Sequence, residues 1–331
     1  MDFGKAYICA PEYGGGTVAG GTQAQVAWPP CGTVTGGARW GMTAPRIALC
    51  AIVRNEIRSI IEWLAHYKAL GFDAFLIYDN ESCDGTEVIL QALDEAGEVT
   101  CLDWPHAVGR WPQRRAYAHA LKGASADWLA FFDADEFLVL HQDADIAAFL
   151  QRFPPDVAAV AVNWVVFGSD GQARYRPQPV TERFADALPE GALWNRVTKA
   201  IGRRAMLKGI GIHQVNPGAG RYVTASGTEA EFDGPMRTLA AETGVASLHH
   251  YMVKSLEEFE EKLQRGNANA QSPVGRRTRL ERRLPMLDAG GARNTDISPW
   301  TGRMRHEAFR LRDILLARGI SYPVWPFLEA E

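Results

Sequence analysis

The stretch Trp128-Leu129-Ala130-Phe131-Phe132-Asp133-Ala134-Asp135 is the most informative part of the sequence. Its first five residues are apolar, as in a buried strand, and they lead directly into two aspartates. On an extended chain, residues two apart point to the same side, so both carboxylates are predicted to project together from the strand end. They repel each other unless a hard cation lies between them, and Mg²⁺ or Mn²⁺ prefers such oxygen ligands. We therefore predict a divalent-metal site at Asp133 and Asp135.

The alternative for these two aspartates is a solvated turn, since many surface loops contain the pattern D-x-D. A second apolar run, Phe137-Leu138-Val139-Leu140, follows them directly. Acidic residues of an exposed loop rarely lie between two apolar runs. The metal site is therefore the favoured interpretation.

Strands and helices alternate on either side of this stretch. Four apolar runs predict strands at residues 47–53, 75–78, 99–102 and 128–132. Three segments with helical spacing lie between them: one with Ile57, Ile60, Ile61 and Leu64 that closes at Gly71, one from Asp84 to Ala96 anchored by Val88, Leu90 and Leu93, and one from Pro112 to Lys122. This rhythm predicts an α/β fold with a mostly parallel sheet and helices on both faces. Ligands of such sheets bind at the carboxyl ends of the strands, where Asp79 and Asp133 lie.

The remaining sequence is less regular. A helix is predicted at residues 145–153 and a strand at 157–167. Residues 168–244 show only weak signals of secondary structure, and we assign them to the side of the protein that would bind a second, acceptor substrate. Ser255 and Glu258 form a capping box that begins a helix ending before Gly266, and a last helix is expected at 306–318. The predicted organisation is a Gly-rich disordered leader (1–41), a catalytic domain (42–266, with a nucleotide-binding half at 46–140 and an acceptor-side half at 141–266) and an Arg-rich helical extension (267–331).

The composition of the chain argues against several classes of protein. The formal charge of −4 gives no general nucleic-acid signature. No apolar run reaches the length of a membrane span, and the N-terminus does not resemble a secretory signal, so we predict a cytoplasmic protein with at most peripheral contact at the inner membrane face. The five cysteines show no C-x-x-C spacing and are predicted to be reduced thiols that bind no zinc.

Five arginines form a basic cluster near the C-terminus. It is expected to be a solvated helix face, with phosphate, acidic polysaccharide or anionic lipid as alternative ligands. Its members are Arg276, Arg277, Arg279, Arg282 and Arg283.

Polar residues near the strand ends are candidates for binding a nucleotide. Asp79 is placed to accept a hydrogen bond from the N3–H of a uracil ring, and the alternative is an Asx-turn. Asp84 is expected to cap the helix that follows it. Arg54 and Glu56 follow the first strand and either contact the ribose or base or simply start a helix.

Two further segments add candidates for phosphate and metal. Gln113, Arg114 and Arg115 open a helix, whose N-terminus favours anions, and the two arginines either help to hold phosphate or are ordinary surface charges. In His249-His250-Tyr251, the neutral imidazole of His250 could complete the coordination of a metal held by Asp135. Lys254 could pair with a diphosphate as a point charge, or be a solvated residue at a helix start.

Taken in order, these motifs resemble glycosyltransferase family 2-like and family 92 proteins over residues 46–266. The resemblance is carried by Cys50-Ala51-Ile52-Val53-Arg54-Asn55-Glu56, Tyr78-Asp79-Asn80-Glu81-Ser82-Cys83-Asp84-Gly85-Thr86, Asp133-Ala134-Asp135-Glu136-Phe137, Phe167-Gly168-Ser169, and His250-Tyr251-Met252-Val253-Lys254-Ser255 followed by Glu257-Glu258-Phe259, Lys262 and Arg265-Gly266. It implies a fold of the GT-A type, a nucleotide-sugar donor and a divalent metal, Mn²⁺ or Mg²⁺. It also implies that Asp79 contacts the base, that Asp133 and Asp135 contact ribose and metal, and that His250 is a third metal ligand.

The first functional hypothesis is a metal-dependent glycosyltransferase that moves a sugar from a UDP-linked donor to a hydroxyl of a glycan or other acceptor. Inversion rests on the resemblance alone, and polysaccharide or cell-surface glycan synthesis is the process this class suggests. The E-D pair that supplies the acceptor base in family 2 is absent, so the base stays open among Glu182, Glu231, Asp233 and His213. A nucleotidyltransferase and a non-catalytic sugar- or nucleotide-binding module are the alternatives. The first lacks a Gly-rich phosphate loop after the first strand, and the second would require lost metal ligands.

Overall fold

A computed structural model describes residues 45–105, 111–265 and 281–322. Within them the largest sheet has nine strands, and eight follow the order β3-β2-β1-β4-β8-β6-β12-β5, with β11 paired to β6. Their bounds are β1 (Ile47–Val53), β2 (Ala74–Asp79), β3 (Thr100–Asp103), β4 (Trp128–Phe131), β5 (Glu136–Leu140), β6 (Val157–Val166), β8 (Thr198–Arg203), β11 (Arg221–Thr224) and β12 (Ala246–His250).

The four strands β3, β2, β1 and β4 pair in parallel, as the sequence predicts. The apolar runs of β1, β2 and β4 are buried almost throughout, with six of the seven residues of β1 buried, whereas β3 at the edge of the sheet is only partly buried. Beyond β4 the sheet is mixed, because β8 is antiparallel to both β4 and β6 whereas β12 is parallel to β6. The predicted α/β class with a mostly parallel sheet is confirmed, and it is the GT-A type of architecture that the resemblance implies.

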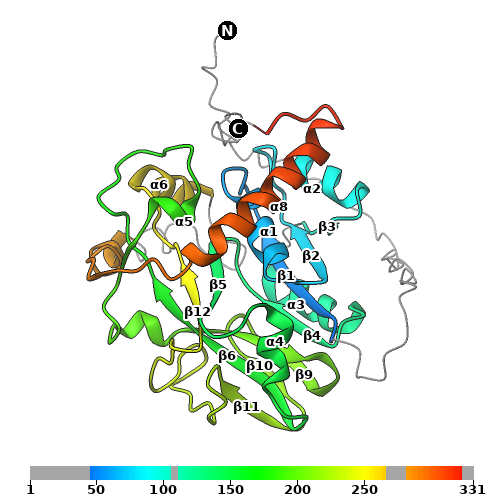
Figure 1. Ribbon diagram of the computed structural model, residues 1–331, viewed down its shortest axis with the longest axis vertical. Coiled ribbons are helices and arrows are strands. Elements are labelled where there is room, and N and C mark those ends of the chain that lie inside the picture. The colour runs from blue at the N-terminus through cyan, green and yellow to red at the C-terminus, as the bar shows by residue number, and fades with distance from the viewer. Residues whose placement is uncertain (1–44, 106–110, 266–280, 323–331) are drawn as a thin grey trace, which may run out of the picture. The chain divides into compact units, whose positions relative to one another are not determined.

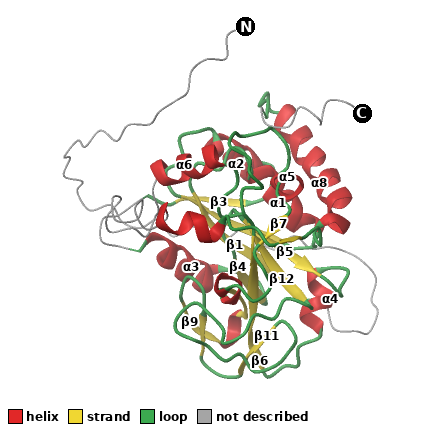
Figure 2. Ribbon diagram, turned by 90° about the vertical axis from the view of Figure 1, so that its left-hand side faces the viewer, coloured by secondary structure: helices red, strands yellow, loops and turns green. Residues whose placement is uncertain are grey.

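Helices cover both faces of this sheet, as Figure 2 shows with α3 on one side of β1 and β4 and with α1 and α8 on the other. The helices are α1 (Ile60–Ala69), α2 (Thr86–Glu95), α3 (Pro112–Gly123), α4 (Ile146–Gln151), α5 (Val180–Arg183), α6 (Leu256–Arg265) and α8 (Ser298–Leu316). The less regular region contains 3₁₀ turns at Leu193–Arg196 and Arg204–Met206 and the small ladder of β9 (Leu207–Ile210) with β10 (Val215–Pro217). A further two-residue ladder joins β7 (Asp186–Ala187) to β13 (Ala292–Arg293). Figure 1 shows β9, β10 and β11 gathered at one end of the sheet.

The second helix begins two residues later than the sequence predicts. It starts at Thr86, and Gly85 occupies the N-cap with φ of 104°, a left-handed conformation that glycine adopts without strain. The buried positions are consequently Thr86, Ile89, Leu90, Ala92 and Leu93. Val88, predicted as an apolar anchor, is 47 % exposed, so that prediction is wrong. The spacing of the buried residues places Val88 on the solvent side of α2.

The C-terminal helix α8 packs against α1 and α2, which flank the N-terminal half of the sheet. Its apolar residues Trp300, Met304, Ala308, Leu311 and Leu315 are buried in the same core as α1. Figure 1 shows α8 lying beside α1 and α2. Residues 266–280 lie outside the described part of the chain, as does most of the Arg cluster.

Glu98, in the turn after α2, connects these helices through its carboxylate. Arg310 of α8 donates to both carboxylate oxygens, at 2.5 and 2.7 Å, and Lys68 of α1 lies 2.8 Å from Oε2. The hydrogen bonds from Arg310 lower the pKa of Glu98 to about 2. The pair thus stabilises the fold above the carboxyl's ordinary pKa and loses this effect as the pH falls toward 2.

We expect Glu98→Gln to lower the free energy of unfolding by about 1 kcal/mol at pH 7, a value reduced for the partial exposure of Arg310. The difference from wild type should shrink steadily below about pH 4.5, because the unfolded wild-type chain then takes up a proton at Glu98 while the folded chain keeps this carboxyl ionised. Urea denaturation at pH 7 and at pH 3 measures both values. An undiminished difference at pH 3 would contradict the ion-pair explanation.

The cysteines depart from the prediction at one position. Cys50 and Cys101 are free, as expected, but Cys83 is disulfide-bonded, so the prediction that all five are reduced is wrong there.

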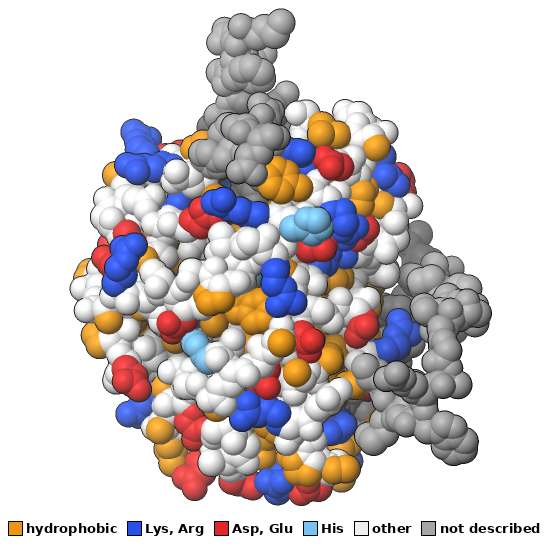
Figure 3. All heavy atoms as spheres, in the orientation of Figure 1, with side chains coloured by type: hydrophobic (Ala, Val, Ile, Leu, Met, Phe, Trp, Pro, Cys, Tyr) orange, Lys and Arg blue, Asp and Glu red, His pale blue; other side chains and the backbone are white. Residues whose placement is uncertain are grey.

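None of the helices in the described part of the chain has the length and apolarity needed to cross a bilayer. On the face drawn in Figure 3, basic and acidic side chains are interspersed and form no large patch of one sign.

Candidate functional site

The aspartates that follow β4 lie in a turn. The strand ends at Phe131, and the chain reverses through Ala134 and Asp135 before β5 begins at Glu136. The turn is closed twice, because the Glu136 N–H donates to the Asp133 carbonyl at 3.0 Å and the Asp133 N–H donates to Glu136 Oε2 at 2.8 Å. The prediction of an extended chain with both carboxylates on one side is therefore wrong, and each carboxylate has its own neighbours.

Asp133 is held by α3 and β8. Its Oδ1 accepts hydrogen bonds from Gln113 Nε2 at 2.8 Å and from the Tyr117 hydroxyl at 3.3 Å. Its Oδ2 lies 2.8 Å from Nζ of Lys199, a fully buried residue in the second position of β8. Burial alone would lower the pKa of Lys199, but the carboxylates of Asp133 and Glu136 outweigh it and the pKa lies above its ordinary value. Lys199 therefore stays charged and fixes Asp133 to the sheet.

Asp135 faces the other way, toward α6 and β12. Lys262 Nζ lies 2.5 Å from its Oδ2, and His250 Nε2 lies 3.5 Å from its Oδ1. Burial would raise the pKa of Asp135, but Lys262, His250 and Lys254 together hold the pKa well below its usual range. Asp135 is consequently an ionised carboxylate with one oxygen on an ammonium group and the other on an imidazole.

His250 lies beside Asp135 at the end of β12, as the sequence predicts. Burial lowers the pKa of His250 despite the nearby carboxylate, which favours the neutral imidazole that a metal ligand requires. Its ring contacts the Trp164 ring at 4.1 Å between centroids, and Trp164 contacts the His213 ring at 5.6 Å. His249 points to the opposite side of the strand and packs against Phe167 in the core. Of the two adjacent histidines, it is therefore His250 that belongs to the site.

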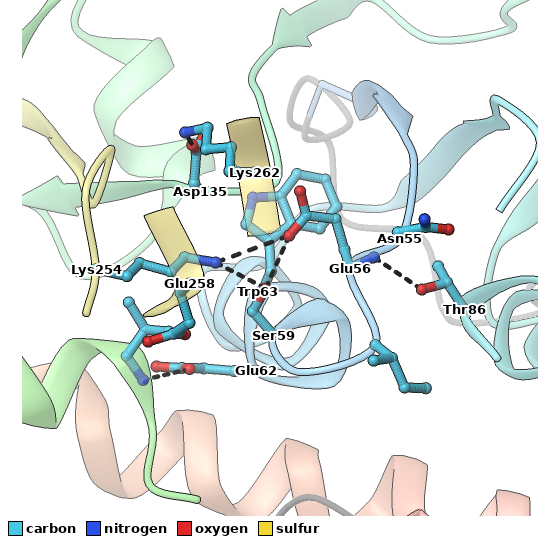
Figure 4. Close-up of polar contacts among 12 residues, drawn as sticks. Asn55, Glu56, Ser59, Glu62, Trp63, Thr86, Asp135, Lys254, Glu258 and Lys262 are labelled. Carbon is cyan, nitrogen blue, oxygen red and sulfur yellow. Dashed lines mark hydrogen bonds and ion pairs between the residues drawn. The ribbon is translucent and has the colours of Figure 1, made fainter. Parts of the chain in front are cut away.

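The loops after β1 and β2 are tied to each other and to α6. The Glu56 N–H donates to Thr86 Oγ1 at 2.8 Å, which joins the two loops. The Glu56 carboxylate lies 2.5 Å from Arg265 and 3.7 Å from Lys254, and Arg265 also donates to the carbonyls of Arg54 and Asn55. Figure 4 shows Lys254 pointing toward Glu56 and Ser59, with Lys262 and Asp135 on the same side. Three basic residues thus line the carboxyl edge of the parallel strands.

Asp79 ends β2 and is nearly buried. Its Oδ1 accepts the Ser82 hydroxyl at 2.5 Å and its Oδ2 accepts the Ser82 N–H at 3.3 Å, so the turn-forming role that was the alternative is present. Burial raises the pKa of Asp79 even with these hydrogen bonds. Asp84 is not the N-cap as predicted, because Gly85 occupies that position, but its carboxylate accepts the N–H groups of Thr86 and Ile57 and supports the start of α2 from one residue before it. Arg114 lies exposed on α3, whereas Gln113 is buried against Asp133.

The four candidate bases lie in different surroundings. Glu182 is held by two hydrogen bonds from Arg305 of α8, at 2.7 and 3.0 Å. Asp233 is exposed and pairs with Arg237 at 3.2 Å, and Glu231 is exposed on the same loop. His213 packs against Trp164, and its Nδ1 lies 3.2 Å from the Thr198 carbonyl. Because a carbonyl only accepts, Nδ1 carries the proton and Nε2 is left as an acceptor.

The described residues contain no group of three His, Cys, Asp or Glu side chains arranged to hold a metal. The best donor set is Asp135 Oδ1 with His250 Nε2, 3.5 Å apart. Two adjacent ligands at about 2.1 Å from an octahedral cation lie about 3 Å apart, so this pair fits after a small shift. Mg²⁺ often takes only one or two protein carboxylates and completes its shell with water and phosphate oxygens. Asp133 does not join the pair in this arrangement, and its role as a third ligand stays a prediction.

Three basic residues of the site, Lys199, Lys262 and Arg265, are absent from the sequence predictions of its binding residues. A signal for Lys199 exists, because a lysine inside the apolar strand Thr198–Arg203 requires a buried carboxylate partner. Lys262 and Arg265 belong to the segment that carries the resemblance, but nothing local assigns them a partner, because basic residues are ordinary in the last turn of a helix.

A family model and the curated relatives point to the same protein family. The sequence model of glycosyltransferase family 92 matches residues 49–279. A family 92 protein of rice, Oryza sativa subsp. japonica, is 29 % identical over 154 residues, which are 45 % of this chain and 26 % of that protein. A family 92 protein of Ricinus communis is 24 % identical over 226 residues, 66 % of this chain and 37 % of that protein. The chain thus spans about a quarter to two fifths of the length of these two relatives.

Two solved structures with similarity to this chain are of enzymes bound to a nucleotide sugar. A mannosyltransferase of Pyrobaculum calidifontis, in complex with GDP-Man and Mn²⁺, aligns with a TM-score of 0.36 and 14 % identity over 83 % of this chain and 76 % of that one. A glucosyl-3-phosphoglycerate synthase of Mycobacterium tuberculosis, in complex with Mn²⁺, UDP-glucose and phosphoglyceric acid, aligns with a TM-score of 0.31 and 16 % identity over 60 % of this chain and 79 % of that one.

Proposed function

Since the chain belongs to glycosyltransferase family 92, we propose that it transfers a sugar from a UDP-linked donor to a hydroxyl group of a glycan or other acceptor, with inversion at the anomeric carbon. The observation that carries this proposal is the pairing of Asp135 with His250 beside Lys254, Lys262 and Arg265. A carboxylate and a neutral imidazole suit a divalent cation, and basic side chains suit a diphosphate. Both groups lie at the carboxyl edge of the parallel strands, where α/β sheets bind ligands.

Asp135 Oδ1 and His250 Nε2 are the proposed ligands of Mn²⁺ or Mg²⁺. When bound, such a cation supplies charge neutralisation for the departing nucleoside diphosphate, an effect worth several kcal/mol. Asp133, whose side chain is 34 % exposed, is proposed to face the ribose while Lys199, Gln113 and Tyr117 hold it in place.

The other nucleotide contacts follow from position. Lys254 is proposed to pair with the diphosphate, with Arg54 and Glu56 beside it on the loop after β1. Asp79 is proposed to accept the N3–H of uracil with the lone pairs that Ser82 leaves free. Arg114, exposed at the first turn of α3, is placed for a phosphate or the acceptor.

The acceptor hydroxyl must lose a proton as its oxygen attacks the sugar. Of the four candidate bases, His213 is the one whose ring contacts Trp164, the neighbour of His250. Its Nε2 is an acceptor, and burial lowers the pKa of His213 to about 4, so it is neutral at pH 7. These contacts favour His213 over Glu182 and Asp233, which are held in ion pairs.

The proposal is tested by supplying a panel of nucleotide sugars with Mn²⁺ and identifying the released nucleotide. We expect UDP to be released with at least one UDP-sugar, and no release when chelator replaces the metal. Release of pyrophosphate in a parallel assay with nucleoside triphosphates and a sugar 1-phosphate would indicate nucleotidyl transfer instead. Donor binding without turnover, across a broad set of hydroxyl acceptors, would favour a non-catalytic binding module.

A further inference from the structure

Lys262 places a positive charge on the same carboxylate that is proposed to bind the cation. Its ammonium group lies 2.5 Å from Asp135 Oδ2 and 3.0 Å from the Met252 carbonyl. Both charged side chains are largely buried, with 19 % of Lys262 and 10 % of Asp135 exposed. The charge of Asp135 is therefore compensated by the protein itself.

We propose that Lys262 is a resident counter-cation of Asp135, which competes with the divalent metal and moves to the donor diphosphate when metal and donor bind together. This inference rests on the proposed function, because it takes the metal and the nucleotide from there. It adds a residue that couples the two binding events.

The geometry makes Lys262 different from its basic neighbours. Lys254 and Arg265 have Glu56 as their carboxylate partner, and Glu56 is not a proposed metal ligand. Lys262 shares Asp135 with the metal site, with Nζ on Oδ2 while Oδ1 faces His250. A divalent cation at Oδ1 would lie across one carboxylate from the ammonium group, and like charges at that separation repel strongly in a buried site.

Lys262 can also leave Asp135 without disturbing the fold. A lysine ammonium is a point charge on a flexible four-carbon stem, so it can turn to a new anion while its helix stays in place. Arg265, one turn further along α6, holds that helix to the loop after β1 through two carbonyls and Glu56. A diphosphate bound beside Lys254 would offer Lys262 the replacement partner.

The consequence is a reciprocal coupling between metal and nucleotide. Without nucleotide, metal binding has to overcome the charge of Lys262, so it is weakened. With nucleotide, Lys262 gains a phosphate partner and Asp135 becomes available. Each ligand must then raise the affinity for the other by the same factor.

The experiment measures Mn²⁺ binding by the paramagnetic resonance signal of free Mn²⁺, with and without UDP, for wild type, Lys262→Met and Lys262→Gln. We expect both variants to bind Mn²⁺ about tenfold more tightly than wild type when UDP is absent. We also expect their affinity for UDP, at saturating Mn²⁺, to fall about tenfold. The coupling factor between the two ligands should shrink accordingly. The matched control is Lys68→Met, which removes a lysine of α1 that pairs with Glu98. This variant should bind both ligands as wild type does.

Equal or weaker Mn²⁺ binding by both variants, relative to a wild type that binds Mn²⁺ measurably, would overturn the inference. Tighter Mn²⁺ binding with no UDP binding in any form supports the competition at Asp135 but refutes the UDP donor of the proposed function. If neither ligand binds wild type, the proposed function and this inference fall together. Thermal unfolding of each variant verifies the fold, and Lys262→Gln keeps a donor for the Met252 carbonyl if Lys262→Met is unstable.

Discussion

Replacing Asp135 with alanine is expected to lower sugar transfer by about 10³-fold or more at saturating Mn²⁺. The reason is that Asp135 is the ionised carboxylate that lies beside both His250 and Lys262. Removing it takes away the oxygen ligand of the proposed cation and leaves the lysine unpaired. A loss of charge stabilisation of several kcal/mol in the transition state corresponds to a rate decrease of this size. The measurement is the turnover of whichever UDP-sugar is active with wild type.

The matched control for this experiment is Asp156→Asn. Asp156 is 59 % exposed and pairs only at the surface, with Arg221 at 2.7 Å. Its loss should leave turnover within about twofold of wild type, since exposed ion pairs contribute little. Undiminished turnover by Asp135→Ala, in a protein that unfolds at the same temperature as wild type, would refute a metal mechanism at this site.

The sheet was predictable because its strands are marked by local sequence. β1, β2 and β4 are short apolar runs, and a run that is buried on both faces needs no information from elsewhere in the chain. The capping box at the start of α6 is equally local, and it is confirmed by hydrogen bonds between Ser255 and Glu258 at 2.6 to 3.3 Å. Residues 168–244 gave weak signals because their short strands and turns are set by contacts with distant segments.

The last helix illustrates a local signal that was misread. It was expected at residues 306–318, but α8 spans Ser298–Leu316. Pro299 and Gly302 argue against a helix in its first turns, yet proline is tolerated at the first helical positions. The burial of Trp300 and Met304 against the core outweighs the cost of Gly302, which is about 1 kcal/mol relative to alanine.

The site was only half predictable, because its charges are balanced by residues far away in sequence. The order of the motifs indicated that Asp135 and His250 lie close together. Lys262, the charged partner of Asp135, is 127 residues away from it in the sequence. The sequence does not reveal that Asp133 and Asp135 have different neighbours, because side chains two residues apart point to the same side only where the chain is extended. The turn at Ala134 depends on Glu136, whose carboxylate binds back to the Asp133 N–H. Such a tertiary arrangement has no periodic signature.

The largest effect on stability is expected for Glu258→Ala. Arg183 donates to both oxygens of Glu258, at 2.8 and 2.9 Å, and the two side chains are 1 % and 6 % exposed. Removing the carboxylate leaves the guanidinium buried and unpaired, which typically costs about 3–5 kcal/mol. It also removes the capping contacts with Ser255, which add about 1 kcal/mol. Urea denaturation at pH 7 measures the free energy of unfolding.

The neighbouring residue provides the control, because Glu257 is 31 % exposed and lies 3.8 Å from Arg174 and 3.9 Å from Arg58. We expect Glu257→Ala to cost no more than about 1 kcal/mol, and an equal loss in both variants would contradict the buried pair. Burial raises the pKa of Glu258, but the hydrogen bonds from Arg183 outweigh it and the pKa lies below its ordinary value. The stabilisation is then complete above about pH 4.3 and is lost as the pH falls through the folded-state pKa. Glu258→Gln keeps the capping side chain, so its deficit isolates the charge and should vanish in acid.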